Sequence, residues 1–102
     1  MPTVGYGSLM AVLSGSELEG ALAGLNGWSE ADGALHKRYE FPDFAAALAY
    51  ANRVGEAAER ANHHPDLLVT WGAVEVSWVN HAEGGITERD VEMARQSDQL
   101  AR

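Results

Sequence analysis

Residues 59–81 read ERANHHPDLLVTWGAVEVSWVNH. Two runs rich in apolar residues, 67–71 and 74–80, are separated by Gly72–Ala73. This arrangement predicts two antiparallel strands joined by a tight turn. In the second run every other residue is valine or tryptophan, which is the period of a strand with one buried face. The stretch therefore predicts a β-hairpin, and three of the four histidines of the chain flank it.

A long helix is predicted directly before this hairpin. Pro42 and Asp43 suit its first turn, and it should end near Ala61, because a residue that precedes a proline such as Pro65 avoids the helical region. Its apolar stripe has helical spacing. The stripe consists of Phe44, Ala47, Leu48, Ala51, Val54, Ala58 and Ala61. Its many alanines would let another element approach closely.

The flanking segments complete a two-layer arrangement. A first helix is predicted from Ser14 or Ser16, paired in a capping box with Glu17 or Glu19, to Asn26–Gly27. A second hairpin, within residues 28–41, turns at Asp32–Gly33 with Trp28 in its first strand. A last helix begins at Thr87, with Asp90 three residues on.

The predicted order is α-β-β-α-β-β-α. We expect an α+β fold with a four-stranded antiparallel sheet and helices packed on one face. Residues 1–13 are expected to be a flexible lead-in, and residues 14–102 a single domain with one modest core. The inner side of the last helix is assigned to Val91, Ala94 and either Asp98 or Leu100.

Composition excludes several classes of function. The chain has 102 residues, no cysteine and a formal net charge of −8. The lack of cysteine rules out thiolate nucleophiles, zinc ribbons and iron–sulfur clusters. The acidic charge disfavours direct contact with nucleic acid. With no long apolar run and no basic leader, we expect no membrane contact and a cytoplasmic location.

The histidines predict a site at one end of the sheet. Closure of the hairpin brings His81 towards His63 and His64, and Glu59 and Asp90 are the carboxylates expected nearby. Imidazole side chains exchange protons near neutral pH, and a carboxylate partner orients them. This set of groups, without cysteine, favours proton transfer over covalent catalysis.

Two other interpretations of the histidines stay open at this point. The His63–His64–Pro65 triplet is also typical of a plain helix end. A three-histidine metal site is a further alternative, although adjacent histidines diverge in extended backbone.

The sequence resembles the pterin-4a-carbinolamine dehydratase family. The resemblance is carried from Glu59 onward by ExxxHHP, the aromatic Trp71 in the first strand, His81, GGIT at 84–87 and Asp90. NGW at 26–28, YEFPDF at 39–44 and AYANRVGEAAE at 49–59 also resemble the family. About 85 residues are covered in this way.

The resemblance implies dehydration of 4a-hydroxytetrahydropterin to quinonoid dihydropterin, the step that recycles the cofactor of aromatic amino-acid hydroxylases. It implies that no metal or organic cofactor takes part and that the chain forms homodimers or homotetramers. His63 and His81 would be general acids and His64 would orient the pterin ring. The substrate would be lined by Pro65, Asn80 and Glu83, beside Glu59 and Asp90.

Two positions depart from the family pattern. Leu67 stands where an aromatic residue is common, and Asn80 where threonine is common. These departures, with the alanine-rich helix, leave an alternative function open, a non-catalytic interaction or assembly protein on the same fold.

Overall fold

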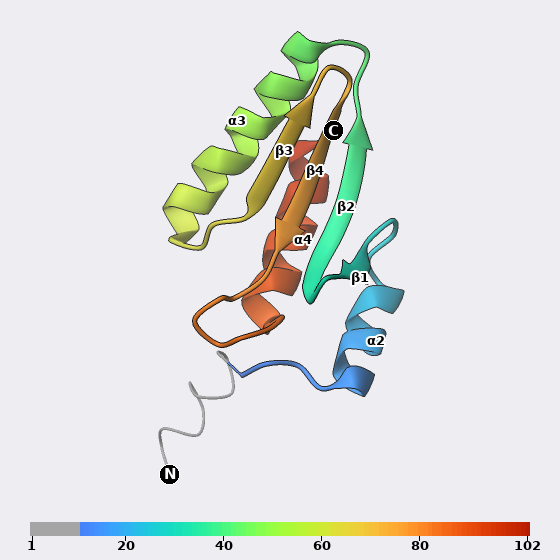
Figure 1. The fold of residues 1–102 in the computed structure, drawn as a ribbon, viewed down its shortest axis with the longest axis vertical. Coiled ribbons are helices and arrows are strands. Elements are labelled where there is room, and N and C mark those ends of the chain that lie inside the picture. Colours follow the sequence, from blue (N-terminus) through green and yellow to red (C-terminus); the bar gives the residue numbers. More distant parts are fainter. Residues whose placement is uncertain (1–10) are drawn as a thin grey trace.

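The computed structural model describes residues 11–102 of the chain, so the first ten positions of the predicted lead-in lie outside the described residues. The order α-β-β-α-β-β-α is confirmed (Figure 1). The elements are α2 (Gly15–Ala23), β1 (Ser29–Ala31), β2 (Ala34–Glu40), α3 (Phe44–Ala61), β3 (Asp66–Thr70), β4 (Ala73–Trp78) and α4 (Glu88–Leu100). No helix in this part of the chain is long and apolar enough to cross a membrane.

The four strands form one antiparallel sheet in the order β1-β2-β4-β3. The β3–β4 register runs from Thr70↔Ala73 to Asp66↔Ser77. The turn therefore falls at Trp71 and Gly72, one residue earlier than predicted. Ala73 already belongs to β4, because it pairs with Thr70 on one side and with Glu40 on the other. Trp71, predicted in the strand, is consequently 70% exposed.

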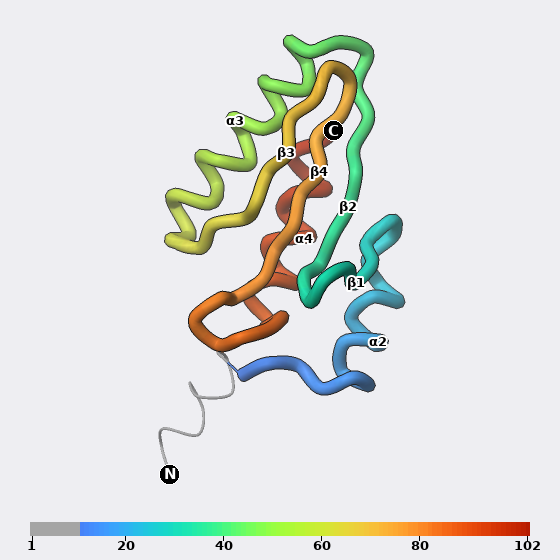
Figure 2. The backbone as a smooth tube through the Cα atoms, viewed as in Figure 1, coloured from blue at the N-terminus to red at the C-terminus, as the bar shows by residue number. Residues whose placement is uncertain are grey.

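Both long helices cover the same face of the sheet, as expected for a two-layer fold. Val74, Val76 and Trp78 of β4 are fully buried beneath them. Helices α3 and α4 contact each other, and both contact β4. The smooth trace in Figure 2 shows α4 running behind the sheet, while α3 lies along β3. Strand β3 remains the edge of the sheet.

The predicted apolar stripe of α3 is partly wrong. The buried residues of the helix are Ala47, Tyr50, Ala51, Val54, Ala57 and Ala58. Phe44 and Leu48 are 46% and 43% exposed, whereas Tyr50 and Ala57 are buried in the core. The buried face is turned in this direction because α3 packs on α4 as well as on the sheet. Tyr50 reaches across this contact, and its hydroxyl donates a hydrogen bond to the Ser97 carbonyl at 2.8 Å.

The capping predictions are confirmed at α2. Ser14 Oγ accepts from the Glu17 N–H at 3.2 Å, and Glu17 Oε1 accepts from the Ser14 N–H at 2.8 Å. The helix ends at Ala23, earlier than predicted. Trp28 lies one residue before β1 and is buried, so the prediction that it belongs to the strand is wrong. The chain leaves the helix early because Leu25 and Trp28 both turn into the core.

Candidate active site

The C-terminal end of α3 fixes the backbone of His63. Asn62 adopts a left-handed conformation, with φ of 52°. The His63 N–H then donates to the Ala58 carbonyl at 3.1 Å, and the Asn62 N–H donates to the Glu59 carbonyl at 3.2 Å. This pair of bonds is a Schellman motif, which satisfies carbonyl groups that a helix end leaves open. The motif ends the helix where the sequence predicted and directs His63 inward.

The His63 ring is held by two other side chains. Its Nε2 lies 2.5 Å from Asp90 Oδ1. The ring also stacks on the Trp78 ring, with centroids 5.6 Å apart and an interplanar angle of 20°. Only 10% of the His63 side chain is exposed. Stacking fixes the plane of the imidazole and the carboxylate fixes its direction within that plane, so His63 is a preoriented proton donor or acceptor.

Asp90 has hydrogen-bond partners on both carboxylate oxygens, although it is fully buried. While Oδ1 contacts His63, Oδ2 accepts from the Thr87 N–H at 2.8 Å and from the Thr87 hydroxyl at 3.2 Å. Asp90 also lies in the first turn of α4, where the helix dipole favours negative charge. Arg89 donates to the Ala61 carbonyl and ties the start of α4 to the end of α3.

His64 points to a different environment. Its Nε2 lies 2.5 Å from Glu59 Oε2, and both side chains are more than half exposed. Together with Pro65 they line a groove of about 710 Å³ between α3 and β3. The other lining residues are Leu48, Ala51, Asn52, Gly55, Glu56, Ala58, Leu67 and Val69. His63 is not among them, because its ring is turned inward onto Asp90 and Trp78.

His81 lies in the turn that follows β4. The turn begins at Asn80, which is 6% exposed, and returns to form a bridge between Asn80 and Gly85. His81 and Glu83 are exposed. Within residues 11–102 the His81 side chain forms no hydrogen bond. The Asn80 carboxamide faces the turn itself, since its Oδ1 accepts from the Glu83 N–H at 3.1 Å.

The structure therefore brings the predicted residues together in two contacting pairs, His63–Asp90 and His64–Glu59. His81 follows the strand that carries Trp78, the residue on which His63 stacks. In the described part of the chain, no three histidine or carboxylate side chains gather closely enough to hold a metal ion. The three histidines thus do not form the ligand set that was considered from the sequence.

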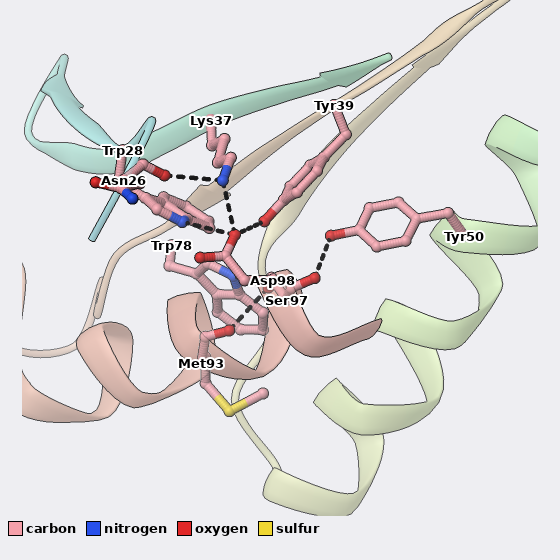
Figure 3. A network of polar contacts seen from close by, with 9 residues as sticks. All are labelled: Asn26, Trp28, Lys37, Tyr39, Tyr50, Trp78, Met93, Ser97 and Asp98. Atoms are coloured by element: carbon pink, nitrogen blue, oxygen red, sulfur yellow. Dashed lines mark hydrogen bonds and ion pairs between the residues drawn. The ribbon is translucent and has the colours of Figure 1, made fainter. Parts of the chain in front are cut away.

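A polar network around Asp98 was not predicted (Figure 3). Asp98 Oδ1 accepts from Trp28 Nε1 at 3.1 Å, from Lys37 Nζ at 2.9 Å and from the Tyr39 hydroxyl. The sequence signal was present, because Lys37 and Tyr39 share the inner side of their strand and Asp98 was one candidate for the inner side of the last helix. What the sequence did not show is that these three segments meet.

The network has electrostatic consequences. Burial raises the pKa of Asp98, but the hydrogen bonds from Tyr39, Lys37 and Trp28 together outweigh burial, so the pKa lies below its ordinary value. Burial, reinforced by the bond to Asp98, raises the pKa of Tyr39. Burial also raises the pKa of Tyr50 to about 12. The network anchors the C-terminal half of α4, the helix whose first turn supplies Asp90.

Trp78 is another residue that was not predicted for the site. Its Nε1 donates to Ser97 Oγ at 3.0 Å, and Ser97 in turn donates to the Met93 carbonyl at 2.8 Å. These bonds fix the indole on which His63 stacks. The sequence placed Trp78 on the buried face of its strand, but strand period alone does not show which ring lies beside it.

Comparison with known proteins agrees with this geometry. The pterin 4 alpha carbinolamine dehydratase family matches residues 11–100. A relative from Mycobacterium sp. (strain KMS), named as a pterin-4-alpha-carbinolamine dehydratase, is 45% identical over 91 residues, which cover 89% of this chain and 97% of the relative. A second relative with the same name, from Mycobacterium avium (strain 104), is 46% identical over 86 residues, which cover 84% of this chain and 92% of the relative.

Two solved structures share the fold. A transcriptional coactivator/pterin dehydratase from Brucella melitensis superposes with a TM-score of 0.85 at 33% identity, covering 89% of this chain and 99% of that one. A pterin dehydratase-like RuBisCO assembly factor of the alpha-carboxysome superposes with a TM-score of 0.59 at 21% identity, covering 72% and 86%. The second likeness concerns the fold alone. From the family match, the identity to its named members and the shared fold, the chain belongs to the pterin 4 alpha carbinolamine dehydratase family of enzymes.

Proposed function

We propose that this protein dehydrates pterin-4a-carbinolamine (4a-hydroxytetrahydrobiopterin) to quinonoid dihydropterin by histidine general acid/base catalysis. The observation that carries the proposal is the buried His63–Asp90 pair, 2.5 Å apart, in a domain of the dehydratase family. In this reaction the 4a-hydroxyl takes up a proton and leaves as water, and the pterin ring gives up a proton. The reaction therefore needs proton delivery and removal, which positioned imidazoles provide.

His63 and His81 act as the general acids in this proposal, one on each side of the pterin. His63 suits the role because Asp90 and Trp78 hold its ring and the side chain is nearly buried. A proton donor that is already oriented loses no free energy to reorientation during the reaction. His81 is exposed and therefore accessible to a substrate from solvent.

His64 orients the ring rather than transferring the proton. Its contact with Glu59 is exposed and leaves the imidazole at the mouth of the groove between α3 and β3. Residues 63–65 and 80–83 line the pterin in this proposal, with Pro65 giving the first segment a rigid direction. Leu67, also on the groove, occupies the place of the aromatic residue that the resemblance implies.

We place the reaction in tetrahydrobiopterin recycling, beside an aromatic amino-acid hydroxylase in the cytoplasm, with no metal or organic cofactor. A homodimer or homotetramer is also part of the proposal. It is supported by the edge position of β3 and by the exposed apolar side chains Leu48 and Leu68 on the two elements of the groove. An unpaired strand edge is a ready template for association with another chain.

The test is the decay of freshly generated 4a-hydroxytetrahydropterin, followed by stopped-flow absorbance with and without the protein. We expect acceleration by the wild-type protein and its loss in the His63→Ala/His81→Ala variant. The matched control is His36→Ala, which removes a histidine that contacts Glu75 on the open face of the sheet. An unchanged rate in the double variant would refute the histidine mechanism.

The second candidate is a non-catalytic interaction or assembly role on the same fold. It is favoured by the apolar side chains Phe44, Leu48, Leu68 and Trp71, each more than 40% exposed. The RuBisCO assembly factor shows that a related fold serves such a role in another protein. A folded protein that neither binds the pterin nor accelerates its dehydration, but forms a stable complex with a different chain in a pull-down, would support this second function.

A further inference from the structure

The position of His81 depends on the backbone that carries it. Its side chain forms no hydrogen bond to any other residue in the range 11–102, and it is exposed. His63 differs, because Asp90 and Trp78 hold its ring directly. Whatever fixes the turn from Asn80 to Gly85 therefore also places the His81 imidazole.

Backbone bonds close this turn around a single residue. The Asn80 carbonyl accepts from the N–H groups of Glu83, Gly84 and Gly85 at 3.2, 2.9 and 3.2 Å. The Asn80 N–H donates to the Gly85 carbonyl at 3.0 Å. Gly84 has a φ of +81°, a conformation that side chains rarely adopt. The turn is thus tightly wound, and Asn80 is the residue on which it closes.

The Asn80 side chain adds a further bond to the same turn. Its Oδ1 accepts from the Glu83 N–H at 3.1 Å, and Asn80 as a whole is only 6% exposed. Side-chain acceptors of this kind stabilise a local turn that the backbone alone holds less firmly. A buried carboxamide that bonds its own turn presents little surface to a substrate.

The end of the turn contacts the segment before α2. The Leu13 N–H donates to the Ile86 carbonyl at 2.8 Å. A Cβ atom at Gly85 would lie 2.8 Å from Val12 Cγ1, so the two segments are in close contact there. Figures 1 and 2 show this segment running beside the loop between β4 and α4. The end of the turn is therefore fixed from outside while Asn80 fixes its start from within.

We propose that Asn80 is a positioning residue for His81, acting through its bond to the Glu83 N–H and not by contact with the substrate. The inference rests on the proposed role of His81 in dehydration. It revises the proposed function at Asn80, whose side chain was placed along the pterin on the basis of the family resemblance.

The test compares Asn80→Ala with Asn80→Asp. The first removes the side-chain acceptor and leaves the Glu83 N–H with the backbone carbonyl of residue 80 alone, whereas the second keeps a side-chain acceptor oxygen and replaces the NH₂ group by a second oxygen. We expect Asn80→Ala to lower kcat about 10- to 100-fold with little change in KM, since displacement of a reacting group by about 1 Å can have this effect. Asn80→Asp should stay within about threefold of the wild-type kcat.

An independent readout is the NMR spectrum of the imidazoles at constant pH. Asn80→Ala should shift or broaden the His81 signals and leave those of His63 in place. In Asn80→Asp the His81 signals should return to their wild-type positions. Tyr50→Phe is the matched control, because it removes one buried hydrogen bond at the α3–α4 contact, far along the chain from this turn. It should lower the melting temperature without moving the His81 signals or kcat.

Each outcome decides the proposal. A rise in KM in both Asn80 variants would show that the carboxamide contacts the substrate and would overturn the positioning role. Equal kcat and equal His81 signals in Asn80→Ala and wild type would overturn it as well. If Asn80→Ala does not fold, Asn80→Asp decides, since a kcat loss of 10-fold or more there contradicts the proposal. If the wild-type protein does not accelerate dehydration, the proposed function fails, whereas the NMR comparison still tests whether Asn80 positions His81.

Discussion

The two candidate acids of this protein are held in opposite ways. The His63 ring is buried and contacts Asp90 and Trp78, which belong to a helix and a strand far along the chain. The His81 ring is exposed and is carried by a short turn whose hydrogen bonds join residues no more than five positions apart. His63 is therefore fixed by tertiary packing, and His81 by local backbone geometry.

This difference predicts two kinds of sensitivity. Changes at Asp90 of α4 or at Trp78 of β4 can reach His63, because these two side chains hold its ring. Changes that reach His81 are confined to its turn and to the segment that covers it. Substitutions in the two regions separate these two routes.

Removal of the buried imidazole should have the largest kinetic effect. In His63→Ala we expect kcat for carbinolamine dehydration to fall by about 10²- to 10⁴-fold, the usual contribution of a general acid or base. Stopped-flow absorbance at saturating substrate measures this directly. The control is His36→Ala, which should keep the wild-type rate. A His63→Ala rate within about twofold of wild type would exclude His63 as an acid.

Loss of the carboxylate behind His63 should have a smaller kinetic effect. In Asp90→Asn the imidazole loses its charged partner, and we expect kcat to fall by up to about 100-fold through misorientation. Stability should also fall by about 1–3 kcal/mol, because a buried hydrogen-bond network is disturbed. Urea unfolding and stopped-flow kinetics measure the two effects. An unchanged kcat in a folded Asp90→Asn protein would contradict the orienting role.

The Asp98 network should affect stability more than catalysis. Asp98→Asn should lower the free energy of unfolding by about 1–3 kcal/mol at neutral pH. Because the folded pKa of Asp98 lies below its ordinary value, the charge stabilises the fold above the ordinary aspartate pKa of about 3.9, and that contribution is lost as pH falls through the folded pKa. The difference between wild type and variant should therefore shrink below about pH 4.

Urea titrations at a series of pH values measure this decrease in the difference between the unfolding free energies of wild type and Asp98→Asn. The turnover of Asp98→Asn at neutral pH should remain near that of wild type, because Asp98 does not contact either histidine. A stability difference that stays constant down to acid pH would show that the charge of Asp98 is not what the network uses.

Removal of the exposed contact between Glu59 and His64 should have the smallest effect on stability. In Glu59→Gln we expect a change below about 1 kcal/mol, since exposed ion pairs contribute little. The kinetic signature should be a raised KM with kcat retained, because His64 is proposed to orient the pterin and not to transfer its proton. Initial rates over a range of substrate concentrations separate the two constants. A fall in kcat alone would assign the pair to the chemical step.

The parts of the fold that follow from local rules could be predicted from the sequence. Strand alternation at Val74, Val76 and Trp78, the helix stop before His63 and the capping residue Ser14 depend on neighbours within a few positions. The position of Trp28 and the buried face of α3 depend on which elements pack together. The first of these predictions was wrong and the second was partly wrong for that reason.

The same distinction between local rules and packing applies to the site. The sequence indicated Glu59, His63, His64 and Asp90, and the structure joins them in two pairs. The divergence of the two adjacent histidines was predicted, but spacing along the chain could not show that His63 is the buried one and His64 the exposed one. Nor could it show the stacking of His63 on Trp78 or the inward direction of the Asn80 carboxamide, since both depend on side-chain rotation in the packed protein.

The most direct test of the account is a double-mutant cycle over His63 and Asp90 in the stopped-flow dehydration assay. The central claim is that Asp90 acts on the reaction only through His63. It predicts that His63→Ala and His63→Ala/Asp90→Asn have the same kcat, although Asp90→Asn alone is slower than wild type. If Asp90→Asn lowered the rate by the same factor with and without His63, the two residues would act independently and the claim would be contradicted.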